Sequence, residues 1–327
     1  MLQAGTRVFV AGHGGLVGSA LVRALQRDGA CRLLLRTRQQ LDLRDAAATR
    51  SFFRAEQPQL VLLAAARVGG IVANARQPYG FIHDNLAIAV NVIEAARDSG
   101  VQRLLFLGSS CIYPRLAPQP IVESALLTGP LEATNRPYAL AKIAGIELCW
   151  SCNREHGTRF LAVMPCNLYG EGDSYDPELS HVIPGLLRRF HAARVNGDAE
   201  VVVWGSGEPR REFLHADDLA AAALHLARLP DADFDALLGD DGLDSAVLRP
   251  PLVNIGMGHD IRIADLAAQV ARVVGFDGRI VFDRSRPDGT PRKLLDVSRI
   301  RASGWAPRIA LDQGLPRAYA DFLTRHA

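Results

Sequence analysis

The chain has 327 residues, of which 48% are hydrophobic and 22% are charged, close to the average of a globular protein. This composition excludes a fibrous protein and long disordered stretches. The 37 basic and 35 acidic side chains leave a net charge of +2, which does not favour a nucleic-acid partner, and no apolar run is long enough to span a bilayer. We therefore expect one large domain or two interleaved domains, without a nucleic-acid or membrane partner.

The first half of the chain alternates between apolar runs and helical patterns. Strands are expected over residues 7–11, 31–36, 60–64, 103–107 and 160–164. Helices are expected over residues 18–28, 46–56, 82–99 and 137–156. Short continuous apolar strands separated by helices are typical of a parallel sheet covered on both faces. The predicted fold class is therefore α/β, with a Rossmann-type doubly wound parallel sheet.

The second half is less regular. Strands are expected over 201–203, 253–255 and 280–282, helices over 216–229, 263–274 and 311–325, and a variable acidic loop over 230–251. We predict a Rossmann domain over residues 1–165, with returning segments near 208–228 and 253–256. Residues 166–327 are predicted to form mainly a smaller, mixed α/β domain.

The cysteines indicate whether the protein works in a reducing or an oxidising compartment of the cell. Five cysteines cannot all pair, and the one close pair, Cys149 and Cys152, lies inside a helical pattern and is predicted to be two ordinary buried thiols. No metal-binding motif is present, so no metal is expected. The N-terminus leads directly into a strand-like segment without a signal peptide. We expect a reduced, cytoplasmic protein.

A glycine-rich turn follows the first expected strand, with Gly12, Gly15 and Gly18 at three-residue spacing. The first glycine would allow a tight turn, the second would let the backbone approach a pyrophosphate, and the third would let helix and strand pack closely. The diphosphate would lie against free N–H groups at the helix N-terminus. A merely flexible turn is the alternative, but the position between the first strand and the first helix favours dinucleotide binding.

The end of the second strand indicates which dinucleotide is bound. An NAD site usually has Asp or Glu there, whereas this chain has Arg36 and Arg38. Two guanidinium groups would pair with a 2′-phosphate, so we predict NADP(H); two solvated arginines are the alternative. Asp42 and Leu43 are placed to border the adenine.

Tyr138 and Lys142 are spaced four residues apart on a predicted helix and therefore share one face. The phenol has a reference pKa of ~10, and a neighbouring ammonium would lower it and make proton transfer easier. The alternative to a catalytic pair is that Tyr138 and Lys142 are an ordinary tyrosine and lysine on an exposed helix face. Ser109, at the end of the fourth strand, favours a site, because ligands bind at the carboxyl edge of such sheets.

Together these residues resemble the extended short-chain dehydrogenase/reductase family. Its cofactor loop and catalytic triad are matched, in order and spacing, by Gly12, Gly15, Gly18, Ser109, Tyr138 and Lys142. Similarity to members that act on GDP-sugars runs through segments 68–71, 107–114, 138–145, 204–207, 211–215 and 287–296. The resemblance implies NADPH-dependent conversion of GDP-4-keto-6-deoxy-D-mannose, by epimerisation at C3 and C5 and then reduction of the C4 ketone.

In that reaction Tyr138 would donate a proton to the carbonyl oxygen, which Ser109 would polarise. The resemblance makes Cys111 the base and His181 the acid of the two inversions. Without the resemblance, Cys111 would be interpreted as a buried thiol and His181 as the residue that starts a helix.

The resemblance also implies the ligand contacts. The expected cofactor-binding residues are Gly12, His13, Gly14, Gly15, Leu16, Val17, Gly18, Arg36, Arg38, Asp42, Leu43, Lys142, Pro165, Asn167, Leu168 and His181. The expected substrate-binding residues are Arg189, Trp204, Arg211, Asp288 and Lys293. A homodimer is expected because the family pairs the helices corresponding to 82–99 and 137–156 across its dimer.

The chain departs from the family pattern at Gly14, Cys166 and Glu171, where Arg, Thr and Pro are usual.

Two alternatives to the predicted function stay open. One is a related enzyme that makes a colitose-type GDP-sugar and needs only the C5 inversion. The other is a catalytically silent NADP sensor, against which the presence of all five expected catalytic residues argues.

Overall fold

The computed structural model describes residues 4–29, 31–176, 180–239, 249–286 and 288–326. Its centre is a parallel sheet of six strands, β1 (Arg7–Ala11), β2 (Arg32–Leu34), β3 (Leu60–Leu63), β4 (Arg103–Leu107), β5 (Phe160–Pro165) and β10 (Leu252–Ile255). The strand order is β10-β5-β4-β3-β1-β2, and the direction of winding reverses between β1 and β3. Reversal points of this kind are where open α/β sheets bind ligands. The predicted Rossmann-type sheet is confirmed.

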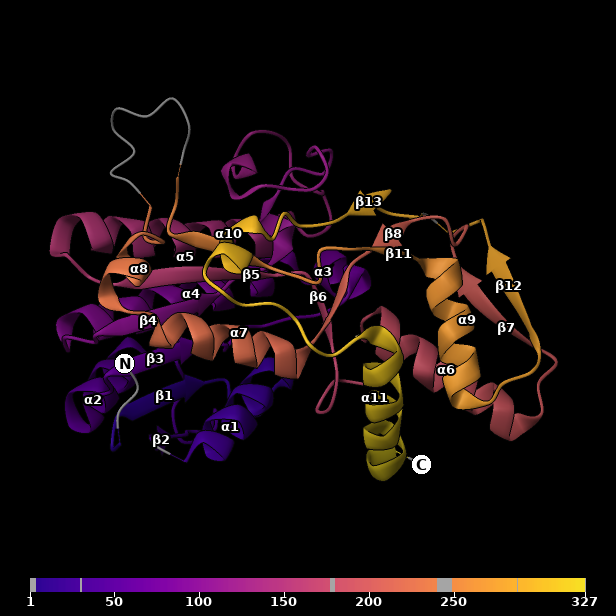
Figure 1. Cartoon of the computed structure of the whole chain (residues 1–327), viewed down its shortest axis with the longest axis horizontal. Coiled ribbons are helices and arrows are strands. Elements are labelled where there is room, and N and C mark those ends of the chain that lie inside the picture. The colour runs from indigo at the N-terminus through magenta and orange to yellow at the C-terminus, as the bar shows by residue number, and fades with distance from the viewer. Residues whose placement is uncertain (1–3, 30, 177–179, 240–248, 287, 327) are drawn as a thin grey trace.

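Helices cover both faces of this sheet (Figure 1). On one side α1 (Leu16–Asp28) packs against α7 (Ala216–Arg228), and on the other α2 (Ala46–Glu56), α4 (Pro78–Asp98) and α5 (Arg136–His156) pack together. A short helix, α3 (Ile71–Arg76), precedes α4. The expected helix over 82–99 begins earlier than predicted, because Pro78 occupies the first turn of α4, where its fixed φ favours a helix start.

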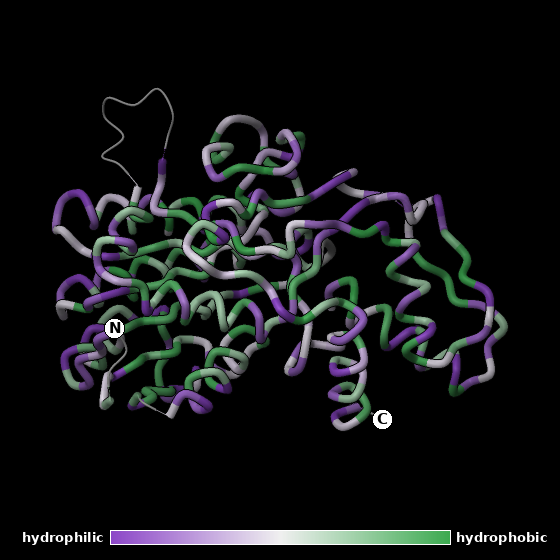
Figure 2. The backbone as a smooth tube through the Cα atoms, in the orientation of Figure 1, coloured by the Kyte–Doolittle hydropathy of each residue, from purple (hydrophilic) through white to green (hydrophobic). Residues whose placement is uncertain are grey.

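Apolar side chains gather into two separate clusters. The first surrounds the central sheet, whose strands stand out as hydrophobic in Figure 2. The second joins α6 (Val182–Asn196), α9 (Ile263–Val274) and α11 (Leu311–His326) to the parallel pair β7 (Glu200–Trp204) and β12 (Arg279–Asp283). The parts built on the two clusters lie on the left and right of Figure 1.

Short strands and turns link the two parts. The pair β6 (Asn167–Tyr169) and β9 (Phe213–His215) is parallel, and β8 (Arg210–Arg211) lies between β11 (Ile261–Arg262) and β13 (Arg292–Lys293). Other short elements are η1 (Ser110–Ile112), η2 (Glu123–Ala125) and α10 (Ser298–Ala302). These links bring residues distant in the sequence to the carboxyl edge of the central sheet.

The expected loop over 230–251 is partly wrong, because it contains the helix α8 (Asp231–Asp235). Asp231 and Asp233 occupy the first turn of α8, where negative charge favours the helix dipole. Phe234 is fully buried beneath the guanidinium of Arg103, 4.3 Å from its ring centroid. The stretch 240–248 of the expected loop lies outside the described residues.

None of the helices in the described ranges combines the length and apolar character that crossing a membrane requires. Cys149 and Cys152 are free and buried within α5, as the sequence predicts.

Candidate active site

The glycine turn between β1 and α1 has the shape of a phosphate cradle. Gly12 has φ +83°, and a Cβ there would lie 2.7 Å from the backbone of Ala65 on the neighbouring strand connection. A Cβ on Gly18 would lie 2.0 Å from the carbonyl oxygen of Gly12, so helix and turn touch. Gly14 faces open space instead, and the N-cap residue Gly15 makes no side-chain capping bond. The first N–H groups of α1 are therefore not capped by a side chain and face a space that accepts an anion.

A buried polar atom in the same turn also points to a ligand. His13 Nδ1 is buried and has no hydrogen-bond partner among the described residues. A buried polar atom is costly to leave unpaired. The turn thus has both the room and the unmet polar groups that a dinucleotide would use.

The basic residues after β2 lie at the edge of this space. Arg36 forms an ion pair of 2.5 Å with Glu56 and lies over the ring of Phe52. Arg38 is 3.7 Å from Asp42, whose pKa is lowered to about 2 chiefly by a hydrogen bond from Arg44. Arg36 is therefore held by a carboxylate, whereas the Arg38 side chain is 68% exposed.

Tyr138 and Lys142 lie on α5 beside the end of β4. The helix can approach the strand because Gly145 leaves room for the ring of Phe106, which a Cβ would meet at 2.4 Å. Lys142 is buried, donates a 2.7 Å hydrogen bond to the carbonyl of Leu107, and has its pKa lowered to about 7 by burial. Its Nζ lies 5.8 Å from the ring centroid of Tyr138.

The hydroxyl and thiol predicted to act with Tyr138 lie in the turn that follows β4. Ser109 Oγ accepts a 3.3 Å hydrogen bond from the N–H of Cys111, and this bond starts η1. The expected lowering of the Tyr138 pKa is wrong: burial raises it, the nearby Cys111 raises it further, and only a hydrogen bond with Ser109 lowers it. The structure therefore brings Ser109, Cys111, Tyr138 and Lys142 together, as predicted.

Lys293 belongs to the same cluster, although the sequence predicts it as a substrate contact. Its Nζ lies 3.7 Å from Cys111 Sγ, across a sequence separation of 182 residues. His181 is the N-cap residue of α6, and no contact in the described part of the chain joins it to this cluster. It is exposed, yet enough protein surrounds its imidazole to lower the pKa by desolvation.

The segment after β5 completes the expected cofactor contacts. Pro165 ends β5, and Asn167 and Leu168 form β6. The Asn167 side chain donates a 2.9 Å hydrogen bond to the carbonyl of Glu212, which fixes its orientation. Cys166, where the family usually has Thr, is buried, and burial raises the pKa of its thiol.

Of the expected substrate residues, Arg189 lies beside Trp204 at the end of β7 and Asp288 beside the loop that follows it, whereas Lys293 lies with Cys111. Trp204 is 58% exposed, with the guanidinium groups of Arg189 and Arg286 at 5.9 and 5.1 Å from its ring. Arg211, on β8, is buried enough that its pKa is lowered, and the charge of Asp288 opposes this shift. The Asp288 carboxylate accepts hydrogen bonds from Ser206 and so shapes the loop after Trp204.

Two features of the site were not predicted. Arg286 has no motif to mark it and reaches Trp204 only through the fold. Glu212 is fully buried, accepts hydrogen bonds from the N–H groups of Gly258 and Leu295, and has a pKa raised to about 7 by burial. Glu212 lies between β8 and β9, and the one signal in the sequence is a carboxylate directly before the apolar pair Phe213–Leu214.

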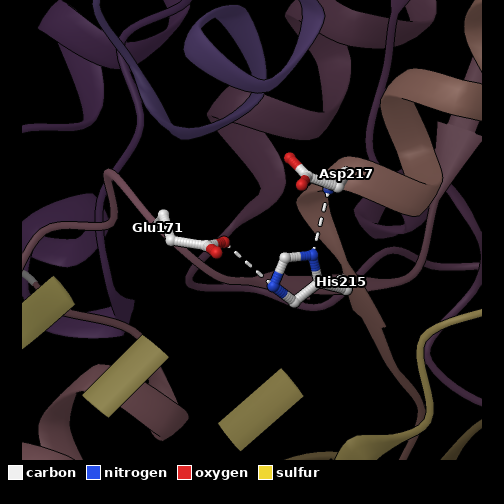
Figure 3. Close-up of side chains that lie close together, drawn as sticks. All are labelled: Glu171, His215 and Asp217. Carbon is white, nitrogen blue, oxygen red and sulfur yellow. Dashed lines mark hydrogen bonds and ion pairs between the residues drawn. The ribbon is translucent and has the colours of Figure 1, made fainter. Parts of the chain in front are cut away.

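One further group could present metal-ligand atoms within 4.8 Å of one another in the described part of the chain, Glu171, His215 and Asp217 (Figure 3). Arg317 bridges the two carboxylates at 2.9 and 2.8 Å, and Arg23 pairs with Asp217 at 2.7 Å. His215 Nδ1 accepts a hydrogen bond from the backbone of Asp217 and Nε2 faces Glu171. The guanidinium groups of Arg23 and Arg317 thus supply the positive charge that balances the two carboxylates. The cluster also joins α1, α7 and α11.

A Rossmann-type sheet with an open glycine cradle, and with Tyr138 and Lys142 at its carboxyl edge, defines a dinucleotide-binding protein of the short-chain dehydrogenase/reductase class. The model of the NAD dependent epimerase/dehydratase family matches residues 8–236. The chain belongs to this family.

Individual relatives and solved structures show which kinds of enzyme within the family this chain is similar to. The chain is 53% identical to a GDP-L-fucose synthase from Escherichia coli (strain K12), over 97% of this chain and 96% of the relative. It is 33% identical to a GDP-L-colitose synthase from Yersinia pseudotuberculosis, over 97% and 98% of the two chains. The structure of a GDP-mannoheptose C4 reductase from Campylobacter jejuni, with NADP bound, is 36% identical with a TM-score of 0.88, covering 99% of this chain and all of that one (100%).

Proposed function

We propose that this protein converts GDP-4-keto-6-deoxy-D-mannose to GDP-L-fucose, by epimerisation at C3 and C5 and then NADPH-dependent reduction at C4. The observation that carries the proposal is the cluster of Ser109, Cys111, Tyr138 and Lys142 at the carboxyl end of β4. The 53% identity with the Escherichia coli GDP-L-fucose synthase supports this substrate over the colitose type, for which the identity is 33%.

The cofactor in this proposal is NADP(H). The residues that would hold it are those of the glycine turn, with Arg36 and Arg38 toward the 2′-phosphate, Asp42 and Leu43 beside the adenine, and Lys142, Pro165, Asn167, Leu168 and His181 along the nicotinamide half. When bound, NADPH supplies the hydride that reduces the ketone. The similar structure with NADP bound supports this choice.

In the reduction, Tyr138 donates its phenolic proton to the C4 oxygen. Burial and Cys111 raise the pKa of Tyr138, so the phenol keeps its proton until a charge develops on the substrate oxygen. Ser109 orients the phenol and the carbonyl by hydrogen bonding. Lys142, anchored on Leu107, places a group that titrates near neutrality beside the ring of Tyr138.

In the epimerisation, Cys111 removes the proton from the carbon next to the ketone, and His181 returns one to the opposite face. The pKa of His181 is lowered below its ordinary value of 6.5, so the protonated donor is the minor form at neutral pH. The fraction of protonated His181 falls further as the pH rises through neutrality.

The GDP moiety is proposed to lie along the second part of the molecule. Arg189, Arg211 and Lys293 bring positive charge toward its diphosphate, and the exposed ring of Trp204 packs on the base or sugar. Asp288 is committed to Ser206 and would act by shaping the loop as well as by accepting from ribose hydroxyls.

We also propose that the first apolar cluster corresponds to an NADP-binding domain over 1–165, with segments near 208–228 and 253–256, and the second apolar cluster to a substrate domain mainly over 166–327.

A homodimer is supported by half-exposed Ile82, Leu86 and Val90, which form a stripe along α4, and by exposed Leu140 on α5. The five free thiols support a reducing, cytoplasmic setting.

The test is an assay of the purified protein with GDP-4-keto-6-deoxy-D-mannose and NADPH, followed by nicotinamide absorbance and by NMR of the product. GDP-L-fucose is the expected product. The Cys111→Ser variant should stop the C3 and C5 protons from exchanging with deuterated solvent while still binding NADPH. NADPH oxidation that yields a sugar inverted only at C5 would favour the colitose-type reaction, and binding of NADPH without oxidation would refute the proposal.

A further inference from the structure

The side chain of Lys293 ends at the sulfur of Cys111, with Nζ 3.7 Å from Sγ. Two other cations of the same small sheet, Arg210 and Arg292, both pair with Asp260, at 2.7 and 2.5 Å. In the described part of the chain, Lys293 has no carboxylate as an ion-pair partner. Adjacent residues of a strand point to opposite faces, which is why Arg292 and Lys293 on β13 have different partners.

The backbone holds Lys293 in this place from both sides. β13 pairs with β8, with Lys293 opposite Arg211. The next two residues are held as well: the Leu294 N–H donates to the Gln119 side chain at 2.8 Å, and the Leu295 N–H donates to the buried Glu212 at 3.1 Å. The fold therefore fixes the backbone of Lys293, and from there its side chain reaches Cys111.

We propose that Lys293 is a positioning residue that stabilises Cys111 as the thiolate needed for epimerisation, in addition to any contact with the substrate. The inference rests on the proposed function and goes further, because it assigns the base its activating partner. An ammonium within about 4 Å of a thiol favours the thiolate by direct Coulomb attraction.

The electrostatic surroundings agree with this pairing. The titratable groups facing Cys111 are Lys293 from β13 and Tyr138 from α5, with the Ser109 hydroxyl beside them. The phenol is neutral because its pKa is raised, so it does not cancel the Lys293 charge. The same charge also lowers the pKa of the neighbouring Cys166 thiol, against the larger effect of burial.

The step itself is a proton transfer. The C–H bond next to the ketone breaks, an S–H bond forms on Cys111, and the electron pair of the C–H bond moves onto the C4 oxygen as an enolate. A proton then returns to the opposite face of the carbon, and the Cys111 thiol releases its proton to solvent before the next inversion. Lys293 remains protonated throughout.

The experiment measures the rate at which iodoacetamide alkylates Cys111 in the full-length protein as a function of pH, with the site identified by peptide mass spectrometry. In the native protein the midpoint should lie below ~8, under the ordinary thiol pKa of ~8.5. Lys293→Met should raise the midpoint by about one pH unit or more, whereas Lys293→Arg, which keeps the charge, should restore it. Arg292→Met removes a neighbouring charge that pairs with Asp260, and should leave the midpoint unchanged.

A second readout separates activation from substrate binding. Lys293→Met should slow solvent-deuterium exchange at C3 and C5 at least tenfold at pH 7, with recovery at higher pH. An unchanged alkylation profile, with only a raised KM, would overturn the inference and leave Lys293 as a substrate contact. If the variant fails to fold, a native midpoint at or above ~8.5 overturns the inference by itself. A shifted profile in a protein that never exchanges C3 or C5 protons would instead refute the role of Cys111 as base and the proposed function.

Discussion

The guanidinium of Arg36 is tied to the carboxylate of Glu56 by an ion pair of 2.5 Å and lies 5.3 Å from the ring centroid of Phe52. Arg36 follows the end of β2, and Glu56 is the last residue of α2, so the pair fixes the arginine at the carboxyl edge of the sheet. A guanidinium held in this way keeps donors for a phosphate without having to be ordered again on binding.

The first prediction follows from this pair. Arg36→Ala should raise the Kd for NADPH about 10- to 100-fold, because hydrogen bonds to a charged group contribute roughly 1.5–3 kcal/mol, and should change the Kd for NADH little. Fluorescence titration with both nucleotides measures this. Arg32→Ala is the control, since Arg32 also pairs with Glu56, at 3.6 Å, but is mostly exposed. Equal weakening of both nucleotides would mean that Arg36 does not recognise the 2′-phosphate.

The second prediction concerns proton donation to the ketone. Tyr138→Phe should lower kcat for NADPH oxidation at least 100-fold, since positioned acid catalysis is worth roughly 10²–10⁴-fold. Proton exchange at C3 and C5, followed by NMR in deuterated water, should continue because Cys111 is retained. Tyr79→Phe on the exposed start of α4 serves as the control. A loss of less than tenfold would assign the proton to another donor.

The third prediction concerns Glu171 in the cluster with His215 and Asp217. Glu171→Gln should lower the free energy of unfolding by about 1–3 kcal/mol, because Arg317 and the buried His215 lose a charged partner. Urea denaturation measures the change. Asp98→Asn, which breaks an exposed pair with Arg97 at 2.8 Å, should cost less than about 0.5 kcal/mol. Equal effects of the two substitutions would show that the cluster does not stabilise the joint between α1, α7 and α11.

The fourth prediction is a pH dependence that originates at Glu212. Its pKa is raised from 4.5 to about 7, so between these values the folded protein binds a proton that the unfolded chain has released. This contribution to stability is complete below pH 4.5 and is lost as the pH rises through 7. The native protein should lose on the order of 1–3 kcal/mol between pH 5 and 8 relative to Glu212→Gln.

Urea denaturation at several pH values isolates the effect of Glu212, because Asp173, whose pKa is also raised to about 7, is present in both proteins and cancels in the difference. Glu208→Gln, with a side chain 68% exposed, should give a profile parallel to that of the native protein. A constant difference between the native protein and Glu212→Gln across this range would contradict the prediction.

The sequence predicts the central sheet well because its inner strands are buried on both faces and therefore appear as continuous apolar runs, as in Leu60–Leu63 and Phe160–Pro165. The two-residue strands β8, β11 and β13 have no such pattern. They exist only because tertiary contacts bring three short segments together, and no local propensity marks them.

The features of the candidate site also fall into those that the sequence predicts locally and those that only the fold creates. The glycine turn and the Tyr138–Lys142 spacing are local patterns, and each is visible in a single helix or turn. The contact between Cys111 and Lys293 joins residues 182 positions apart, and the bridge made by Arg317 depends on where the last helix docks. Such relations depend on the arrangement of whole elements, so residue types and spacing alone could not reveal them.

The last strand of the central sheet comes late in the chain. β10 (Leu252–Ile255) pairs with β5 only after the chain has passed through α6, β7 and α7. A nascent chain released from the ribosome before Leu252 would carry five of the six strands, with β5 as an open edge that offers unpaired N–H and C=O groups to other chains. Stalled or truncated translation products of this protein would therefore be the species most exposed to misassembly and would depend most on chaperones, even though the finished sheet is covered on both faces.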